Sequence, residues 1–588
     1  LVSRVLLPYS DVSNFDDLPI PFRCVATDLE NGDVVVFDHG PIAPAVRASM
    51  SIPGTFDPVR LNGRLIADGG ILNNIPVDIA EKMGSDVVIA VRTGPKADER
   101  PEETIGGVAK RAITLMMQSL EKPKLREADV VIVPNLDGLT GGDFDKADEF
   151  AERGYAAAEL QKDALMRYAL GDADWAAYRA SIDARKKPRT DAISFVEVTG
   201  VAERAATEIT QQLSRHIGKK QDIPSIEDDL NRMIGLGRYA SATYTKVLDD
   251  NGMGLGVSVR DKSYGPPFVR FGLQTNNENE DINLAVGARV TLMDITGVGS
   301  EWRFDGTLGS TLAFTTEWYQ PLAGARPIHG GAFLSPHAGY SRTTESLYSD
   351  HDLAAIYGQQ RVAAGMDLGW NSGGNTRFRI GYEAAHVRNV IRVGEPVLPA
   401  TTGGEQSLRA RFDSDGQNAA YLASHGVRFS SNARWFLKAP DARKEFGLVE
   451  ASFLAATTAG RANILSVSME GGFSLSTTPP LLYQFSLGGP FRLGGFPTYA
   501  FRGPKYFLGG LGLKAPIGRL PPLLGGRVYL GSLVEAGSVF TDPTNARVKT
   551  SFTTGVAADT FLGPFFAGGS VGSDGNVRVY FLIGRIVR

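Results

Sequence analysis

The second half of the chain alternates polar and apolar residues with a period of two. In Leu465–Ser476 (LSVSMEGGFSLS) the odd positions are apolar or small, and the even positions are polar or small. A run of this length is about what a β-strand needs to cross a membrane at a tilt. Similar segments are Phe268–Gln274, Trp302–Ser310, Ala313–Gln320, Thr376–Glu383, Val528–Ala536 and Val577–Ile583.

Residues 268–588 are long enough for about sixteen such strands, at roughly 20 residues for each strand and its turn. An even number of antiparallel strands is typical of outer-membrane β-barrels. A soluble β-sandwich or a repeat array is the alternative, although no blade-length repeat is present. Two polar stretches, Thr343–Asp352 and Ala400–Asp415, are predicted to be external loops.

The front of the chain alternates short apolar runs with longer helix-like stretches. The runs Val34–Phe37, Val87–Val91 and Val130–Val133 are rich in β-branched residues and are predicted to be buried parallel strands. This alternation predicts an α/β unit in residues 1–185, with helices on both faces of a mostly parallel sheet. The predicted helices are Ile42–Met50, Pro76–Met83, Glu103–Leu120 and a closing helix Asp145–Leu170, followed by a linker, Gly171–Arg189.

Residues 192–263, between these two parts, predict the element order β-α-α-β-β. The first predicted helix, Ala202–Ile217, has one apolar face, and the second opens with a capping box at Ser225. The predicted strands are Ile193–Thr199, Tyr239–Leu248 and Leu255–Val259.

The stretch Arg64–Met83 (RLIADGGILNNIPVDIAEKM) places an acidic residue where a strand gives way to a helix. Asp68 follows a short apolar run, and Gly69 and Gly70 follow Asp68. Enzymes with α/β folds often place catalytic groups at such a position, because the strand holds the carboxylate and glycines let a ligand approach the backbone. Asp-Gly is also a common turn dipeptide, so the motif alone favours a turn.

The amino-acid composition excludes several classes of functional site and points to no further candidate site. The 588 residues include 61 basic and 65 acidic side chains, which give no electrostatic footprint for nucleic acid. A single cysteine excludes an intrachain disulfide, and the seven histidines lack paired spacing, so no metal site is predicted. No apolar run reaches about 18 residues, so no transmembrane helix is expected. The chain starts at Leu1 in what resembles the middle of a domain, and we expect it to be a fragment.

Four segments between residues 22 and 91 resemble, in order and spacing, the C-terminal half of a patatin-like phospholipase domain. They read FRCVATDLENGDVVVFDHG, AVRASMSIPGTF, GRLIADGGILNNIPVDIA and GSDVVIAV. The resemblance implies a serine–aspartate dyad, in which a serine on a G-x-S-x-G elbow attacks an acyl ester and an aspartate takes its proton. A glycine-rich loop upstream supplies the oxyanion hole. Asp68, with Gly69 and Gly70, matches the aspartate motif.

The nucleophile of this dyad is not found before Asp68. No G-x-S-x-G and no glycine-rich loop precede it. The one literal match, Gly568–Gly572, is predicted to be a strand and hairpin, because a strand follows it where an elbow requires a helix. The chain therefore carries a candidate base, Asp68, without a nucleophile, and is predicted to be inactive alone.

The middle and back parts resemble known modules as well. Residues 192–263 resemble a POTRA domain, a periplasmic module that offers sheet edges to other chains, although a structural spacer is the alternative. EWYQPL (Glu317–Leu322) and LGGPFRLGGF (Leu487–Phe496) resemble motifs of the surface-antigen barrel family. The second motif corresponds to a loop that folds into the barrel. Gly494 stands where that family has an arginine, and Arg492 lies two residues earlier.

These resemblances predict a patatin-like domain in residues 1–185, a POTRA-like domain in 192–263 and an outer-membrane barrel of roughly 16 strands in 268–588. The combination resembles the fused-lipase branch of type V secretion. It implies hydrolysis of phospholipid or other acyl esters at the Gram-negative outer membrane, without cofactor, by a hydrolase portion that is periplasmic, surface-exposed or secreted. An exposed POTRA edge would permit a homodimer. The alternatives are an outer-membrane assembly or translocation factor with a degenerate patatin portion, and a structural barrel with a vestigial front end.

Overall fold

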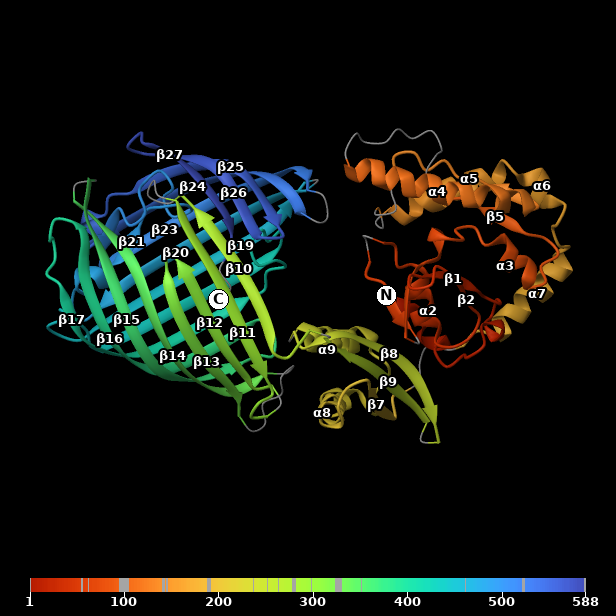
Figure 1. The fold of residues 1–588 in the computed structure, drawn as a ribbon, viewed down its shortest axis with the longest axis horizontal. Coiled ribbons are helices and arrows are strands. Elements are labelled where there is room, and N and C mark those ends of the chain that lie inside the picture. The colour runs from red at the N-terminus through yellow and green to blue at the C-terminus, as the bar shows by residue number, and fades with distance from the viewer. Residues whose placement is uncertain are drawn as a thin grey trace. The chain divides into compact units, whose positions relative to one another are not determined.

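The computed structural model describes residues 2–53, 56–61, 63–94, 105–139, 143, 146–187, 192–235, 237–250, 252–262, 264–277, 282–297, 299–322, 330–349, 352–460, 462–520 and 524–585. The chain divides into two compact units (Figure 1). One consists of Leu1–Glu227 and Ser241–Arg260, and the other of Asp228–Ala240 and Asp261–Arg588.

The front of the chain contains two small sheets. The first has the order β2-β1-β4-β3, and the second pairs β5 with β6 in parallel. Ile89–Val91 and Val130–Ile132 therefore confirm two of the predicted parallel strands, but the prediction that both are buried is wrong for β5, whose Ile89 and Val91 are exposed. The strands are β1 (Cys24–Asp28), β2 (Val34–Phe37), β3 (Val59–Leu61), β4 (Arg64–Asp68), β5 (Ile89–Val91) and β6 (Val130–Ile132).

The prediction of a buried parallel strand at Val34–Phe37 is wrong. These residues form β2, which pairs antiparallel with β1 and has side chains that are at most half-buried. Only five residues, 29–33, connect the two strands. A parallel connection needs a crossover of a dozen or more residues, so this short turn permits only a hairpin.

The helices of the front part are α1 (Val2–Leu6), α2 (Ile42–Ser49), α3 (Val77–Lys82), α4 (Ile105–Glu127), α5 (Ala147–Glu159), α6 (Lys162–Met166) and α7 (Asp172–Ala184). Short 3₁₀ turns cover Leu7–Tyr9, Phe15–Asp17 and Gly69–Ile71. The predicted helix starts Glu103 and Asp145 lie outside the described residues, and the closing helix is divided into α5 and α6.

The predicted linker Gly171–Arg189 is mostly helix. Gly171 caps α7, and Asp172 and Asp174 occupy its first turn, where carboxylates stabilise a helix through its dipole. Five alanines within α7 add helix propensity. The basic stretch KKPR, which is typical of a linker, begins at Lys186, after the end of this helix.

The predicted β-α-α-β-β order of the middle part is observed. β7 (Phe195–Thr199), α8 (Glu203–Leu213), a 3₁₀ turn (Ser214–His216), α9 (Ile223–Gly235), β8 (Tyr239–Asp249) and β9 (Gly252–Asp261) follow one another. β9 is the central strand and pairs in parallel with β7. The predicted cap at Ser225 is wrong, because α9 begins at Ile223 and the Asp222 carboxylate accepts from Ser225 N.

In the back part, sixteen strands within the described residues close into an antiparallel barrel, which confirms the predicted strand number. β10 meets β27 through Gln274–Asn276 and Leu582–Gly584. The strands are β10 (Phe268–Asn276), β11 (Asn283–Met293), β12 (Glu301–Gly309), β13 (Leu312–Pro321), β14 (Gly331–Ser349), β15 (Asp352–Asn371), β16 (Thr376–Gly394), β17 (Thr401–Asp415), β18 (Gly426–Lys438), β19 (Phe446–Ala459), β20 (Asn463–Leu475), β23 (Lys505–Arg519), β24 (Gly525–Phe540), β25 (Lys549–Thr560), β26 (Gly563–Gly572) and β27 (Val577–Gly584).

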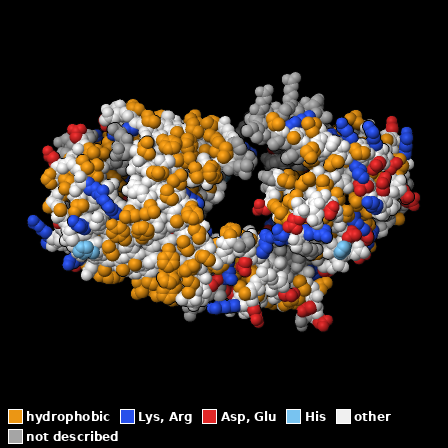
Figure 2. Space-filling model, in the orientation of Figure 1, with side chains coloured by type: hydrophobic (Ala, Val, Ile, Leu, Met, Phe, Trp, Pro, Cys, Tyr) orange, Lys and Arg blue, Asp and Glu red, His pale blue; other side chains and the backbone are white. Residues whose placement is uncertain are grey.

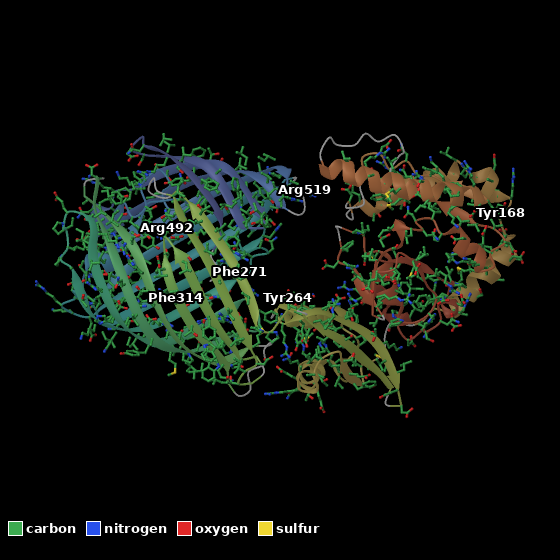
Figure 3. The ribbon with its side chains drawn as sticks, in the orientation of Figure 1. Tyr168, Tyr264, Phe271, Phe314, Arg492 and Arg519 are labelled. Atoms are coloured by element: carbon green, nitrogen blue, oxygen red, sulfur yellow. The ribbon has the colours of Figure 1, made fainter. Side chains whose placement is uncertain are left out.

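The outer wall of the barrel is apolar. Hydrophobic side chains cover much of the barrel face seen in Figure 2. Phe271 on β10 and Phe314 on β13, labelled in Figure 3, are 77% and 50% exposed. An apolar outer band is the surface that a transmembrane barrel presents to lipid. Among the helices that the structure describes, none is long and apolar enough to span a membrane.

The predicted external loops Thr343–Asp352 and Ala400–Asp415 are wrong for nearly all their length. Their residues belong to β14, β15 and β17. In β17, Glu405 and Ser407 point inward and are buried, whereas Leu408, the residue after Ser407, points outward and is exposed. The polar side chains of β17 therefore point into the barrel interior, where charged side chains pair with them. The segment can be polar and still form a strand of the barrel wall.

The segment between β20 and β23 folds into the barrel, as its resemblance implied. It contains a 3₁₀ turn (Leu481–Tyr483), β21 (Phe485–Leu487) and β22 (Phe501–Gly503), and its Leu493 and Phe496 are fully buried against β23. Gly494 N donates to Glu535 Oε2 at 3.1 Å, and the Tyr580 hydroxyl donates to Gly494 O at 2.6 Å.

No side chain larger than hydrogen fits at Gly494. A Cβ there would lie 2.5 Å from Ser570 Oγ and 2.7 Å from Thr553 Oγ1. The main chain of Gly494 thus makes the contact with the barrel wall at the position where the surface-antigen family has an arginine side chain.

Candidate functional site

Asp68 is the last residue of β4, and its backbone is fixed on two sides. In the register of β1 and β4 it lies opposite Ala26. Asp68 N donates to Ser51 O at 3.0 Å, and Thr27 Oγ1 donates to Asp68 O at 2.9 Å. The strand therefore presents the Asp68 side chain from a rigid position, as the sequence predicted.

The Asp68 carboxylate is half-buried and held by one hydrogen bond. Gly70 N donates to Asp68 Oδ1 at 2.7 Å, so Asp68 caps the 3₁₀ turn that begins at Gly69. The other oxygen, Oδ2, has no hydrogen-bond partner among the described residues. Burial raises the pKa of Asp68, and the hydrogen bond from Gly70 offsets only part of this effect. A carboxylate of this kind is a better proton acceptor than an exposed one.

Neither glycine after Asp68 has free space for a side chain. A Cβ on Gly69 would lie 2.2 Å from Val25 O of β1, which is backbone that cannot move independently of the sheet. A Cβ on Gly70 would lie 2.7 Å from Asn74 Oδ1 and 2.9 Å from Asp68 Oδ1. The turn can therefore approach β1 only with glycine at position 69, whereas a Cβ at position 70 would displace the side chains of Asn74 and Asp68.

We expect Gly69→Ala to destabilise the front part by about 2 kcal/mol or more, because overpacking against backbone forces the strand to shift. The measurement is the denaturant midpoint of the helical circular-dichroism signal. The matched control is Gly154→Ala in α5, where a Cβ meets nothing within 4 Å. Alanine in a helix should stabilise by up to about 1 kcal/mol. Equal midpoints for the two variants would contradict the contact argument.

Helix α4 holds the loop that follows Asp68. Asn74 Nδ2 donates to Glu121 Oε1 at 2.6 Å, and Arg92 Nε donates to Glu121 Oε2 at 3.0 Å. Glu121 is only 4% exposed. None of these three residues was predicted as part of the site. Nothing in their local sequence brings together residues 74 and 121, and Glu121 lies one residue beyond the predicted helix Glu103–Leu120, whereas α4 continues to Glu127.

The remaining predicted features are placed as follows. Ser570 of the Gly568–Gly572 match lies on β26, is buried and shares a 2.6 Å hydrogen bond with Thr553 Oγ1, so it is part of the barrel wall as predicted. Burial raises the pKa of the Cys24 thiol to about 12, consistent with a core residue. The described residues contain no group of three or more metal-ligating side chains.

Comparison with known proteins identifies the front part. Residues 6–81 match the family model "Patatin-like phospholipase". An uncharacterized NTE family protein of Mycobacterium tuberculosis is 44% identical over 94 residues, which cover 15% of this chain and 26% of that protein. Patatin-like phospholipase domain-containing protein 7 of Rattus norvegicus is 29% identical over 169 residues, 24% of this chain and 12% of that protein. The chain thus spans 26% of the length of the first relative and 12% of the second.

A structural comparison identifies the back part. BamA from Haemophilus ducreyi lacking POTRA domains 1-3 has a TM-score of 0.51 and 14% identity, over 67% of this chain and 84% of that chain. Similarity at this identity concerns the fold. The chain therefore joins a part that resembles a patatin-like phospholipase over residues 6–81 to a closed 16-stranded β-barrel, and its fold is similar to that of BamA.

Proposed function

We propose that the chain is the C-terminal part of a patatin-like phospholipase that its own barrel carries in the Gram-negative outer membrane. Its domains are the hydrolase portion 1–185, a POTRA-like domain 192–263 and the barrel 268–588. The reaction is hydrolysis of a glycerophospholipid acyl ester. The observation that carries the proposal is the half-buried Asp68 carboxylate, with Oδ1 held by Gly70 and Oδ2 without a partner among the described residues.

In this reaction Asp68 acts as the general base. A serine hydroxyl attacks the ester carbonyl and passes its proton to Asp68 Oδ2, and Asp68 returns the proton to the alcohol that leaves the acyl-serine. Water then attacks the acyl-serine and gives a proton to Asp68, which returns it to the serine oxygen as the fatty acid leaves. Backbone N–H groups stabilise the oxyanion. Gly69 and Gly70 shape the turn. Because no G-x-S-x-G precedes Asp68 within the 588 residues, the serine and the oxyanion loop come from sequence outside them.

Exposed apolar side chains in the front part support the proposal that further sequence completes the hydrolase domain. Ile89 and Val91 of β5 and Leu115 and Met116 of α4 are exposed, Met116 by 68%. Parallel sheets are normally covered on both faces, and two strands alone are seldom stable. Ile89 and Val91 lie on one face of β5, opposite the buried Ala90, and the next residue, Arg92, pairs with Glu121 beside the Asp68 turn. We infer that this uncovered face of β5 packs against the part of the domain that holds the serine.

The test compares two proteins on phospholipid vesicles. One is the 588-residue chain, and the other is the same chain extended by the coding sequence upstream of Leu1. We expect fatty-acid release by the extended protein alone, and a G-x-S-x-G on a strand–helix turn in the extension. Hydrolysis by the 588-residue chain, or an inactive extension without the motif, would overturn the proposal.

The raised pKa of Asp68 predicts the pH dependence of the extended enzyme. A general base must be deprotonated, so kcat/KM should fall as the pH drops through the pKa of Asp68. We expect this acid limb to lie above about 3.9, the ordinary value for aspartate. The pH profile of kcat/KM checks it, and a limb at or below the ordinary value would contradict the role of burial.

The alternative function is assembly or translocation of outer-membrane proteins, with a degenerate patatin portion. The inward-folded segment docked at Gly494 and the BamA fold favour it. This alternative predicts that depletion of the protein lowers the amounts of other outer-membrane barrels, and that Asp68→Asn restores them as well as the wild type does.

A further inference from the structure

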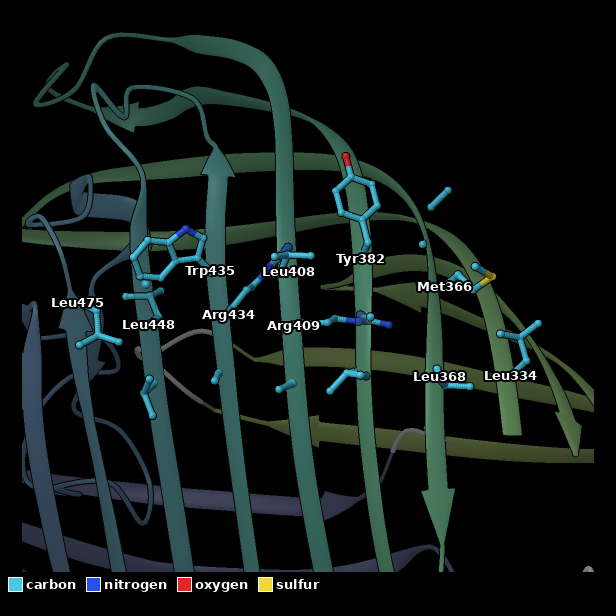
Figure 4. A pocket seen from close by; sticks show the side chains of 18 residues that line it. Leu334, Met366, Leu368, Tyr382, Leu408, Arg409, Arg434, Trp435, Leu448 and Leu475 are labelled. Carbon is cyan, nitrogen blue, oxygen red and sulfur yellow. The ribbon is translucent and has the colours of Figure 1, made fainter. Parts of the chain in front are cut away.

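The outer wall of the barrel is hollowed between β14 and β20. The groove has a volume of about 860 Å³, and most of the residues that line it are apolar, although Arg409 and Arg434 also border it (Figure 4). Its outward-facing lining includes Leu334, Met366, Tyr382, Leu408, Trp435 and Leu475. This volume lies within the range of small-molecule sites in proteins.

Small residues at the centre of the wall create the hollow. Leu408 lies opposite Trp435, and Trp435 lies opposite Gly447. A Cβ on Gly447 would lie 2.7 Å from Trp435 Cε3, so the indole ring lies over the glycine. In the neighbouring row, Ala410 lies opposite Ala433. Large side chains therefore border a floor of glycine and alanine.

The groove opens to the outside of the barrel. Met366, Tyr382 and Leu408 are exposed, whereas Asp367 and Glu383, which follow two of them in sequence, are buried. Successive side chains of a strand point to opposite faces, so the groove lining and the buried carboxylates lie on opposite sides of the wall. If the barrel lies in a membrane, as proposed above, hydrocarbon chains are what this outer face contacts.

A polar turn lies beyond one end of the groove. Trp435 Nε1 donates to Glu445 Oε2 at 3.1 Å, which ties the ring to the β18–β19 turn at residues 439–445. Lys438, Arg443 and Lys444 are exposed at this turn, and so are Asp441 and Glu445, which leaves one net positive charge there. Lys438 is three residues along β18 from Trp435, which corresponds to about 10 Å, and Arg443 and Lys444 lie in the turn that leads to Gly447. Cations at that distance suit a phosphate joined to an acyl chain.

We propose that this groove binds an anionic glycerophospholipid, with one acyl chain between Met366 and Trp435 and the phosphate at Arg443 and Lys444. The proposal rests on the membrane location proposed above. It differs from general lipid solvation in two respects: the acyl chain fills a defined hollow, and the cations select an anionic head group.

Photocrosslinking tests the site. The 588-residue chain is inserted into phosphatidylcholine vesicles containing a trace of phosphatidylglycerol with a photoreactive acyl chain, and labelled peptides are identified by mass spectrometry. We expect label on β16–β19, and a fivefold or greater loss of it in Ala433→Phe, which fills the floor. The control is Ala288→Phe on β11, which shares an outward face with exposed Val286 and should keep the label.

A second pair of measurements tests the head-group contact. Photoreactive phosphatidylcholine should label the groove several-fold less than phosphatidylglycerol, and Arg443→Gln with Lys444→Gln should abolish this difference. Equal labelling of wild type and Ala433→Phe, or label spread over the whole wall, would overturn the site. Heat-modifiable migration on gels reports insertion, and a chain that does not insert would overturn the membrane location together with the site.

Discussion

Asp68→Asn is expected to lower ester hydrolysis by the extended, complete enzyme by roughly 10²–10⁴-fold, the usual contribution of a general base. The asparagine oxygen can still accept the hydrogen bond from Gly70 N, which now measures 2.7 Å to Asp68 Oδ1. The turn should therefore keep its shape. What is lost is the capacity of Oδ2 to take the serine proton. The measurement is kcat/KM for fatty-acid release from phospholipid vesicles.

The matched control is Asp78→Asn. Asp78 lies ten residues further on in α3, where its carboxylate contacts Asn73 Nδ2 at 3.0 Å and Lys124 Nζ at 3.1 Å. We expect near-normal activity from this variant. Activity retained by Asp68→Asn would reduce Asp68 to a turn residue and favour the assembly-factor alternative. Equal losses in both variants would indicate damage to the loop as a whole.

The part of the site that the sequence predicted is the part formed by neighbouring residues. Asp68, Gly69 and Gly70 belong to one turn, so a short apolar run and two glycines sufficed to place them. Glu121 escaped prediction because it reaches Asn74 across 47 residues of sequence, and only the packing of α4 against the turn brings them together.

The fold shows the same division between local and distant effects. A period of two predicts strands with one apolar face, such as β20, whereas the polar composition of β17 predicts a loop. Its Glu405 and Arg409 look exposed in sequence, yet they lie in a charged interior that only the closed barrel creates. The hairpin of β1 and β2 was not predicted. The β-branched residues of β2 favour a buried parallel strand, whereas the short turn before it, which permits only a hairpin, was not considered.

That charged interior depends on Glu383 of β16, which is 6% exposed. Its carboxylate accepts from Arg434 at 2.8 Å and from Arg409 at 3.1 Å, and it also pairs with Arg361. The same arginines reach Asp367 and Glu405, so the inner wall from β15 to β18 is one connected network. Glu383 is the carboxylate that all three guanidinium groups share.

Glu383→Ala is expected to destabilise the barrel by about 3–5 kcal/mol, because the three guanidinium groups would then share only Asp367 and Glu405, and one partly buried positive charge would lose its compensation. The measurement is the denaturant midpoint of barrel unfolding in vesicles, followed by heat-modifiable migration. The control is Asp413→Ala on β17, whose pair with Arg411 is 33% and 62% exposed and should contribute at most about 1 kcal/mol. A loss for Glu383→Ala no larger than for the control would mean that water in the lumen screens the network. The interior would then be a wet channel wall, and its paired charges would not hold the strands together.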